Sequence, residues 1–95
     1  MVKKLKLPSG LEGTIIQLLG TNATKSMNDH LRSKLNHYFH DKKIDVQVSK
    51  VKSNHSLIFV PKQVEYGTVD SKMKSLLTVN KTSYKNLSYI LHKVP

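Results

Sequence analysis

Three short stretches of the chain are almost entirely apolar. They span residues 14–19 (Thr-Ile-Ile-Gln-Leu-Leu), residues 57–60 (Leu-Ile-Phe-Val) and residues 76–79 (Leu-Leu-Thr-Val). Runs of four to eight apolar, partly β-branched residues are typical of strands that are covered on both faces. The sequence therefore predicts a buried strand at residues 14–19 and at 57–60, and residues 76–79 are a further strand candidate.

One stretch has the spacing of a helix with a single apolar face. Its apolar residues lie four, four, three and one positions apart, namely Met27, Leu31, Leu35, Tyr38 and Phe39. Ser26, with Asp29 three positions later, resembles a capping box and places an acid at the positive end of the helix. A helix is therefore predicted from about Ser26 to Asp41.

Three further segments have patterns of their own. In residues 44–48 apolar and polar side chains alternate, which predicts an edge strand with one buried face. Residues 70–74 fit a short helix. A last helix is predicted over residues 84–94, beginning near Thr82 or Ser83 and closed by Pro95, from the stripe Tyr84, Leu87, Leu91 and Val94.

The predicted order of elements is β-α-β-β-α-β-α in a single small α/β domain. Two fully apolar runs beside one alternating strand favour a four-stranded, mostly parallel sheet in the order 2-1-3-4, with helices on both faces. Residues 1–13 are interpreted as a leader or linker, and residues 14–95 as the domain. The predicted core consists of Ile15, Ile16, Leu18, Leu31, Leu35, Ile58, Phe59, Leu87 and Leu91.

The amino-acid composition excludes several kinds of site. The 95 residues include no cysteine, so disulfides, thiolate metal sites and cysteine nucleophiles are excluded. The sequence contains no signal peptide. Its apolar runs are much shorter than the roughly 18 residues that a membrane span needs, so a cytoplasmic location is expected.

The chain is strongly basic, with a formal net charge of +10. Such a charge is compatible with nucleic acid, an anionic membrane or an acidic protein as partner. Arg32 is the only arginine among 16 Lys and Arg residues, and bidentate Arg is the usual reader of base edges, so sequence-specific DNA recognition is not favoured. The lysines are scattered, which also fits a solvated surface.

The loop after the first predicted strand is the candidate binding site. Its small and polar residues are Gly20, Thr21, Asn22, Thr24, Lys25 and Ser26. A strand that runs through such a loop into a helix N-terminus directs free N–H groups at an anion. The loop lacks the spacing of a Walker loop, so an anion or phosphate site is one interpretation and a plain helix-capping turn is the other.

Several motifs resemble the enzyme IIB family of the bacterial sugar phosphotransferase system, in its galactitol/mannitol-like branch. The resemblance covers residues 14–94 and is carried by the element order and by residues 23–27 (Ala-Thr-Lys-Ser-Met), 43–48 (Lys-Ile-Asp-Val-Gln-Val), 57–60 and 83–87 (Ser-Tyr-Lys-Asn-Leu). In that family, a cysteine at the end of the first strand accepts a phosphoryl group. Here the corresponding positions, Leu18 to Gly20, hold no nucleophile, so thiol phosphotransfer is impossible.

The resemblance implies a degenerate, non-catalytic domain like the C-terminal domains of Mga/AtxA-type virulence regulators. Such a domain serves dimerisation and transcription regulation, so the expected partner is a protein, either another protein or a second copy of the chain. Two alternatives stay open: a small basic protein that binds nucleic acid through its lysines, and a phage- or plasmid-type inhibitor that docks on an acidic host protein. No cofactor is expected.

The histidines and tyrosines suggest no further chemistry. His37 and His40 lie three positions apart but lack a third ligand, so solvent-facing histidines are predicted and no metal site. The six acidic residues are dispersed, without a carboxylate pair for acid–base work. If the domain self-associates, the expected surface is apolar area that the helices leave uncovered, such as Tyr38, Tyr66 or Tyr89.

Overall fold

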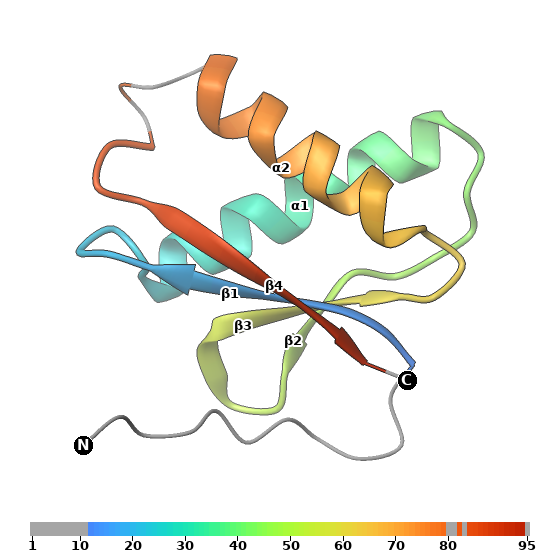
Figure 1. Cartoon of the computed structure of the whole chain (residues 1–95), viewed down its shortest axis with the longest axis horizontal. Helices are drawn as coiled ribbons and strands as arrows, with labels where there is room; N and C mark the ends of the chain where they lie inside the picture. Colours follow the sequence, from blue (N-terminus) through green and yellow to red (C-terminus); the bar gives the residue numbers. More distant parts are fainter. Residues whose placement is uncertain (1–11, 80–81, 83, 95) are drawn as a thin grey trace.

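Six elements follow one another in the order β-α-β-β-α-β (Figure 1). The computed structural model describes residues 12–79, 82 and 84–94 of the chain. The elements are β1 (Gly13–Leu19), α1 (Lys25–Asp41), β2 (Ser49–Val51), β3 (Asn54–Pro61), α2 (Tyr66–Val79) and β4 (Ser88–Val94). This connectivity is the split β-α-β, or ferredoxin-like, topology.

The sheet is antiparallel throughout, and its order is β2-β3-β1-β4. The predicted mostly parallel sheet in the order 2-1-3-4 is therefore wrong. The apolar runs at residues 14–19 and 57–60 do form the central strands β1 and β3. These strands pair with each other directly, with Ile16 opposite Ile58. A central strand is buried on both faces whichever way its neighbours run, so a continuous apolar run does not report strand direction.

The short β2–β3 connection fixes part of this direction. Val51 lies opposite Asn54, which leaves only Lys52 and Ser53 in the turn, and Lys52 has a positive φ of 48°. A two-residue loop can join only antiparallel strands, because a parallel pair needs a crossover of a dozen or more residues.

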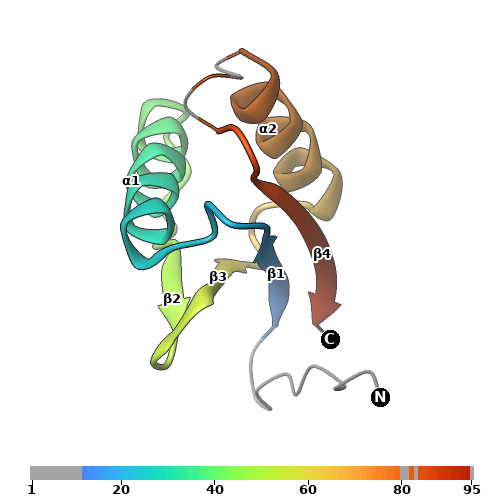
Figure 2. The same cartoon turned by 90° about the vertical axis from the view of Figure 1, so that its left-hand side faces the viewer.

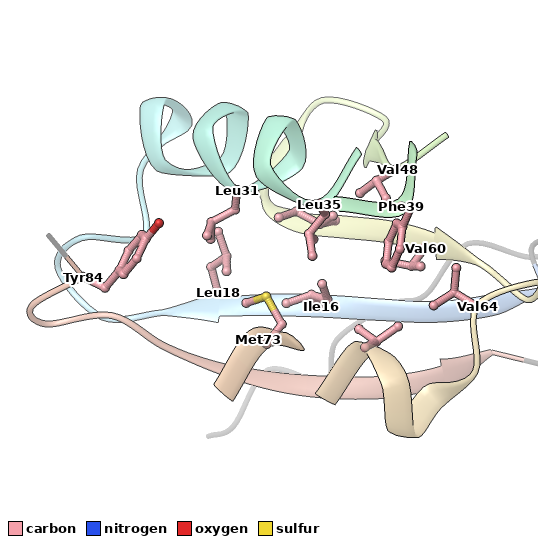
Figure 3. Packing of buried hydrophobic residues seen from close by; sticks show 12 residues of the cluster. Ile16, Leu18, Leu31, Leu35, Phe39, Val48, Val60, Val64, Met73 and Tyr84 are labelled. Atoms are coloured by element: carbon pink, nitrogen blue, oxygen red, sulfur yellow. The ribbon is translucent and has the colours of Figure 1, made fainter. Parts of the chain in front are cut away.

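Both helices lie on one face of the sheet (Figures 1 and 2), so the predicted covering of both faces by helices is also wrong. The main core lies between this face and the helices, and Figure 3 shows Ile16 and Leu18 of β1 directed toward them. The helices contribute Leu31, Leu35 and Phe39 from α1, and Val69 and Met73 from α2. The helical stripe in the sequence thus identifies the buried face of α1 correctly.

The other face of the sheet carries a second, smaller cluster. Its buried members are Ile15, Val51, Leu57 and Val94, with Phe59 packed against them at partial burial. Ile15 and Ile16 point to opposite faces and both are fully buried. This explains why the β1 sequence is apolar without alternation.

The C-terminal elements differ from the prediction. Residues 76–79, predicted as a strand, form the last turn of α2, which also contains the predicted short helix at 70–74. Residues 88–94, predicted as part of a helix, form β4 along β1, so there is no helix among the described residues after α2. A positive φ of 60° at Asn86 is incompatible with a helix continuing from Tyr84 into Leu91.

The segment 44–48, predicted as an edge strand, does not pair with the sheet; the edge strand β2 begins only at Ser49. The side chain of Asn36 on α1 takes the place of a neighbouring strand at Val48. Its Nδ2 donates to the Val48 carbonyl at 3.1 Å, and its Oδ1 accepts from the Val48 N–H at 2.7 Å. With these backbone groups satisfied, Val48 is fully buried without a ladder partner.

Most of the predicted core is confirmed. Six of its members are buried: Ile15, Ile16, Leu18, Leu31, Leu35 and Ile58. Phe59, Leu87 and Leu91 are partly buried and pack against the two clusters. Of the predicted leader, residues 1–11 lie outside the described residues, and Gly13 already belongs to β1.

Candidate functional site

The predicted anion-binding loop connects β1 to α1, and the structure brings its residues together at the N-terminus of the helix. Thr24 is the N-cap residue: its side chain accepts a hydrogen bond from the Met27 N–H at 3.2 Å. The predicted cap at Ser26 is therefore two residues late, because Ser26 already lies inside α1.

Three backbone donors of the loop have partners within the protein. The Asn22 N–H donates to the Asn86 carbonyl at 3.2 Å, and the N–H of Ala23 donates to the Gly20 carbonyl at 3.1 Å. The Thr24 N–H donates to the Asn22 carbonyl at 3.0 Å. These bonds stabilise a helix-capping turn, and binding of an anion by the loop stays a prediction.

The charged group of the loop is also engaged. The Lys25 ammonium lies 3.3 Å from the Asp29 carboxylate, and this contact lowers the pKa of Asp29. Arg32 contacts the same carboxylate from the next turn of α1. Lys25 is thus directed along the helix surface toward Asp29.

An open cleft of about 370 Å³ lies beside the loop. Its lining residues are Asn22, Thr24, Ser26, Met27, His30, Lys34 and Tyr84. His30 Nε2 lies 2.9 Å from the Tyr84 hydroxyl, and burial raises the pKa of Tyr84. Lys34 contributes the ammonium group of the cleft lining, and Asn22, Thr24 and Ser26 of the predicted loop face this concave surface.

The histidines of α1 are exposed, as the sequence predicts. His37 lies 3.4 Å from Asp41 on the helix surface. Within residues 12–79, 82 and 84–94, no group of three or more His, Cys, Asp or Glu residues could hold a metal ion. His92 of β4 is partly buried and lies within hydrogen-bonding distance of Gln17 on β1, at 2.8 Å.

Part of the basic surface is engaged within the protein. The Lys72 ammonium lies 4.1 Å from the ring centroid of Tyr38, and that of Lys42 lies 5.7 Å from it. Lys62 and Lys74 form ion pairs with Glu12 and Asp70. A tyrosine ring already contacted by two ammonium groups is a poor platform for stacking a base.

The outer edge of β4 is a feature that the sequence analysis missed. β4 is seven residues long, lies at one edge of the sheet and pairs with β1 alone. The opposite edge, β2, is three residues long and contains a register shift at Lys50 and Val51. Shortness and bulges are among the devices by which proteins block edge strands, and β2 has both. β2 contains one lysine, Lys50. β4 has one lysine, Lys93, near its end.

Exposed apolar side chains lie on β4 and α2 but on different faces: Ile90 is opposite Gln17, on the sheet face away from the helices, whereas Tyr66 and Val79 are at the two ends of α2. The large hydrophobic residues exposed in the described structure are Tyr66 (42%), Ile90 (47%) and Val79 (83%). All belong to β4 or to α2, and Figure 2 shows these two elements side by side. Of the tyrosines predicted for a self-association surface, Tyr66 and Tyr89 lie here, whereas Tyr38 lies on α1.

One polar contact fixes β4 to α2. The Tyr89 hydroxyl donates to the Asp70 carboxylate at 2.8 Å, and Lys74 lies 3.2 Å from the same carboxylate. Both contacts hold the pKa of Asp70 below its usual range, the hydrogen bond from Tyr89 more than Lys74. Burial and the Asp70 contact raise the pKa of Tyr89.

We expect Tyr89→Phe to raise the pKa of Asp70 toward its ordinary value. Because the folded protein depresses this pKa, Asp70 stabilises the fold above the pKa it has in the unfolded chain, and this contribution is lost as the pH falls through the folded value. The variant should therefore lose less stability on acidification. An NMR pH titration of the Asp70 carboxyl carbon measures the shift. Tyr38→Phe is the control and should leave Asp70 unchanged.

The comparisons with known proteins give no relative. No protein-family model, no curated protein and no solved structure matches this chain. The split β-α-β topology alone does not indicate a function, because it carries many unrelated ones.

None of the helices in the part of the chain that the structure describes is both long and apolar enough to span a membrane.

Proposed function

We propose that the chain is a non-catalytic protein-interaction module that binds its partner along the β4 edge and the adjoining flank of α2. The observation that carries this proposal is the contrast between the two sheet edges. β2 is short and irregular, whereas β4 is long and regular, and β4 carries the exposed apolar side chain of Ile90 on the sheet face away from the helices. An open strand edge beside apolar surface is the arrangement used in recognition by strand addition.

The proposal does not depend on the resemblance to enzyme IIB-like regulatory domains. That resemblance implies the same class of function, protein interaction without chemistry. It is carried in part by the predicted element order β-α-β-β-α-β-α, however, and the described elements follow the order β-α-β-β-α-β. The proposal therefore rests on the surface alone.

In-cell cross-linking tests the proposal. The tagged chain is produced in its own host and cross-linked with formaldehyde, and the attached proteins are quantified by mass spectrometry. Ile90→Lys, which places a charge on the exposed face of β4, should reduce recovery of the specific partners at least about fivefold, since charged groups are disfavoured in interface cores. Ser53→Lys adds the same charge at the exposed β2–β3 turn and should not reduce recovery. Equal recovery with both variants would contradict the proposal.

Nucleic acid is the second candidate partner, favoured by the net charge of +10. We expect little binding of a single- or double-stranded oligonucleotide at 50 mM salt, measured by fluorescence anisotropy, because the lysines are scattered and several are engaged in ion pairs. Clear binding at 50 mM that falls about tenfold or more by 200 mM salt would instead establish several lysine–phosphate contacts.

A further inference from the structure

The direction of the backbone groups in β4 follows from the pairing of the central strand. The Lys62 N–H donates to the Glu12 carbonyl at 3.1 Å, so residues 12 and 62 form a hydrogen-bonded pair across β1 and β3. Along an antiparallel strand, successive residues direct their backbone groups to opposite sides. Even-numbered residues of β1 therefore bond to β3, and odd-numbered residues bond to β4.

This alternation determines which residues of β4 are left open. The odd-numbered residues of β1 lie opposite Val94, His92, Ile90 and Ser88. These four use their N–H and C=O groups on β1. The residues between them, Tyr89, Leu91 and Lys93, direct theirs away from the sheet, where no described element pairs with β4.

We infer that a second copy of the chain fills this edge, with the two β4 strands paired antiparallel across a two-fold axis at Leu91. The inference rests on the proposed interaction function and names its partner. In this register Leu91 faces Leu91 of the second copy, and Tyr89 faces Lys93. Every backbone group left open by β1 then has a partner, and the two sheets form one continuous sheet.

Charge favours this register. Two copies that each carry +10 repel, so they can meet only where charge is sparse or complementary. Lys93 is the single charged residue of β4, and the register separates the two Lys93 side chains by placing each opposite a tyrosine. The Tyr89 hydroxyl bonds to the Asp70 carboxylate, which also pairs with Lys74, so Lys93 of the other copy would approach an ion pair and not an unpaired positive charge.

The side chains on both faces of the joined sheet are compatible with a two-fold axis at Leu91. On the face toward the helices, Leu91 is partly buried and packs against the main core, and it would meet its own copy. On the opposite face, exposed Ile90 would lie across from partly buried His92. Neither pairing brings two like charges together.

Cysteine cross-linking tests the register, and the absence of native cysteine makes it specific. Under mild oxidation Leu91→Cys should form a disulfide dimer, since residues that face each other across antiparallel strands lie within disulfide reach. Lys93→Cys should not, because two copies of residue 93 would lie about 13 Å apart in this register. Random collision would favour the exposed position 93 over the partly buried position 91. Faster cross-linking at 93 would overturn the inference.

Sedimentation velocity over a concentration series tests the association itself. The wild-type chain should show a mass that rises toward twice the monomer mass with concentration. Lys93→Pro removes an outward N–H that β1 does not use, so the chain should fold normally, by circular dichroism, but associate at least about tenfold more weakly. Lys93→Ala separates the effect of the lost N–H from that of the lost charge and should associate more strongly than Lys93→Pro.

The outcomes separate this inference from the proposed function. A wild-type chain that stays monomeric at millimolar concentration would overturn the second-copy inference. If host proteins still cross-linked in cells and were lost in Ile90→Lys, the interaction function would stand with a different partner. If neither association nor cross-linked partners were found, both would fail.

Discussion

Replacing Gly20 with Ala should lower the free energy of unfolding by about 3 kcal/mol or more, near the upper end of single-residue effects. Gly20 has a φ of 106°, a conformation that residues with a side chain rarely adopt. A Cβ built on it would overlap the carbonyl oxygen of Asn86. This oxygen accepts the hydrogen bond from the Asn22 N–H, so moving it away would loosen the loop from the turn that leads into β4.

The matched control is Gly67→Ala. Gly67 lies in the first turn of α2, and no atom lies within 4 Å of where its Cβ would be. Alanine should therefore be neutral there or stabilise the protein by about 0.4–1 kcal/mol, because it restricts the unfolded chain. Urea denaturation of the three proteins measures both effects. Equal stabilities for the two variants would show that the loop can yield at Gly20.

The elements that the sequence predicts correctly are those with strong local patterns. The helical stripe from Met27 to Phe39 specifies α1 together with its buried face, and the apolar runs specify β1 and β3. In each case burial in the folded protein and spacing in the sequence agree. The same kinds of pattern fail at residues 76–79, an apolar run that forms the last turn of α2, and at the stripe from Tyr84 to Val94, which contains β4.

The direction of the strands was not accessible in the same way. Apolar runs buried on both faces favour a parallel sheet, but in this chain the second face of β1 and β3 is buried in a small cluster around Ile15 and Leu57. The decisive feature is the two-residue turn at Lys52 and Ser53, which contains neither Gly nor Asn. Nothing in its composition marks it as a hairpin turn.

β4 shows how two periods can fit one sequence. Tyr84, Leu87, Leu91 and Val94 have helical spacing, yet Tyr89 and Leu91 also alternate with Ile90 and His92. The strand conformation is favoured by β1. The backbone N–H and C=O groups of its odd-numbered residues need a neighbouring strand as hydrogen-bond partner, which a helix cannot provide. Tyr, Ile and Val are also residues that favour strands. The strand preference of these residues is visible in the sequence, but the helical spacing of the apolar stripe is the stronger pattern.

The candidate interaction surface at the β4 edge is hidden by the wrong prediction of a helix over residues 84–94. The loop from Gly20 to Ser26 was visible from composition, and the structure places it where expected, at the N-terminus of α1. The sequence pattern predicts a helix over residues 84–94 and therefore does not reveal the β4 edge. An open edge is a property of strand order, and strand order is not encoded within any one strand.

Asn28 should be as important to stability as the apolar residues around it. Its side chain is fully buried on α1, where Nδ2 donates to the carbonyls of His55 at 2.8 Å and Leu57 at 3.2 Å. β2 is too short to pair with these groups, because its register shifts from Lys50 opposite Ile58 to Val51 opposite Asn54. Arg32 Nε in turn donates to Asn28 Oδ1 at 2.7 Å. The only arginine of the chain therefore orients the amide that completes the edge of β3.

Asn28→Leu should accordingly lower the free energy of unfolding by about 2–4 kcal/mol, even though it preserves volume, because it leaves buried polar groups without partners. Asn28→Asp should cost at least as much, since it replaces the donor with an oxygen that faces the two carbonyls. Asn54→Asp is the control: Asn54 is exposed and uses its Oδ1 to accept from the Ser56 N–H, which a carboxylate can also do, so its stability should change by less than about 0.5 kcal/mol. Urea denaturation compares them. If Asn28→Leu were as stable as the wild type, water or a rearranged β2 would have to satisfy the β3 carbonyls, and Asn28 would not hold α1 to the sheet.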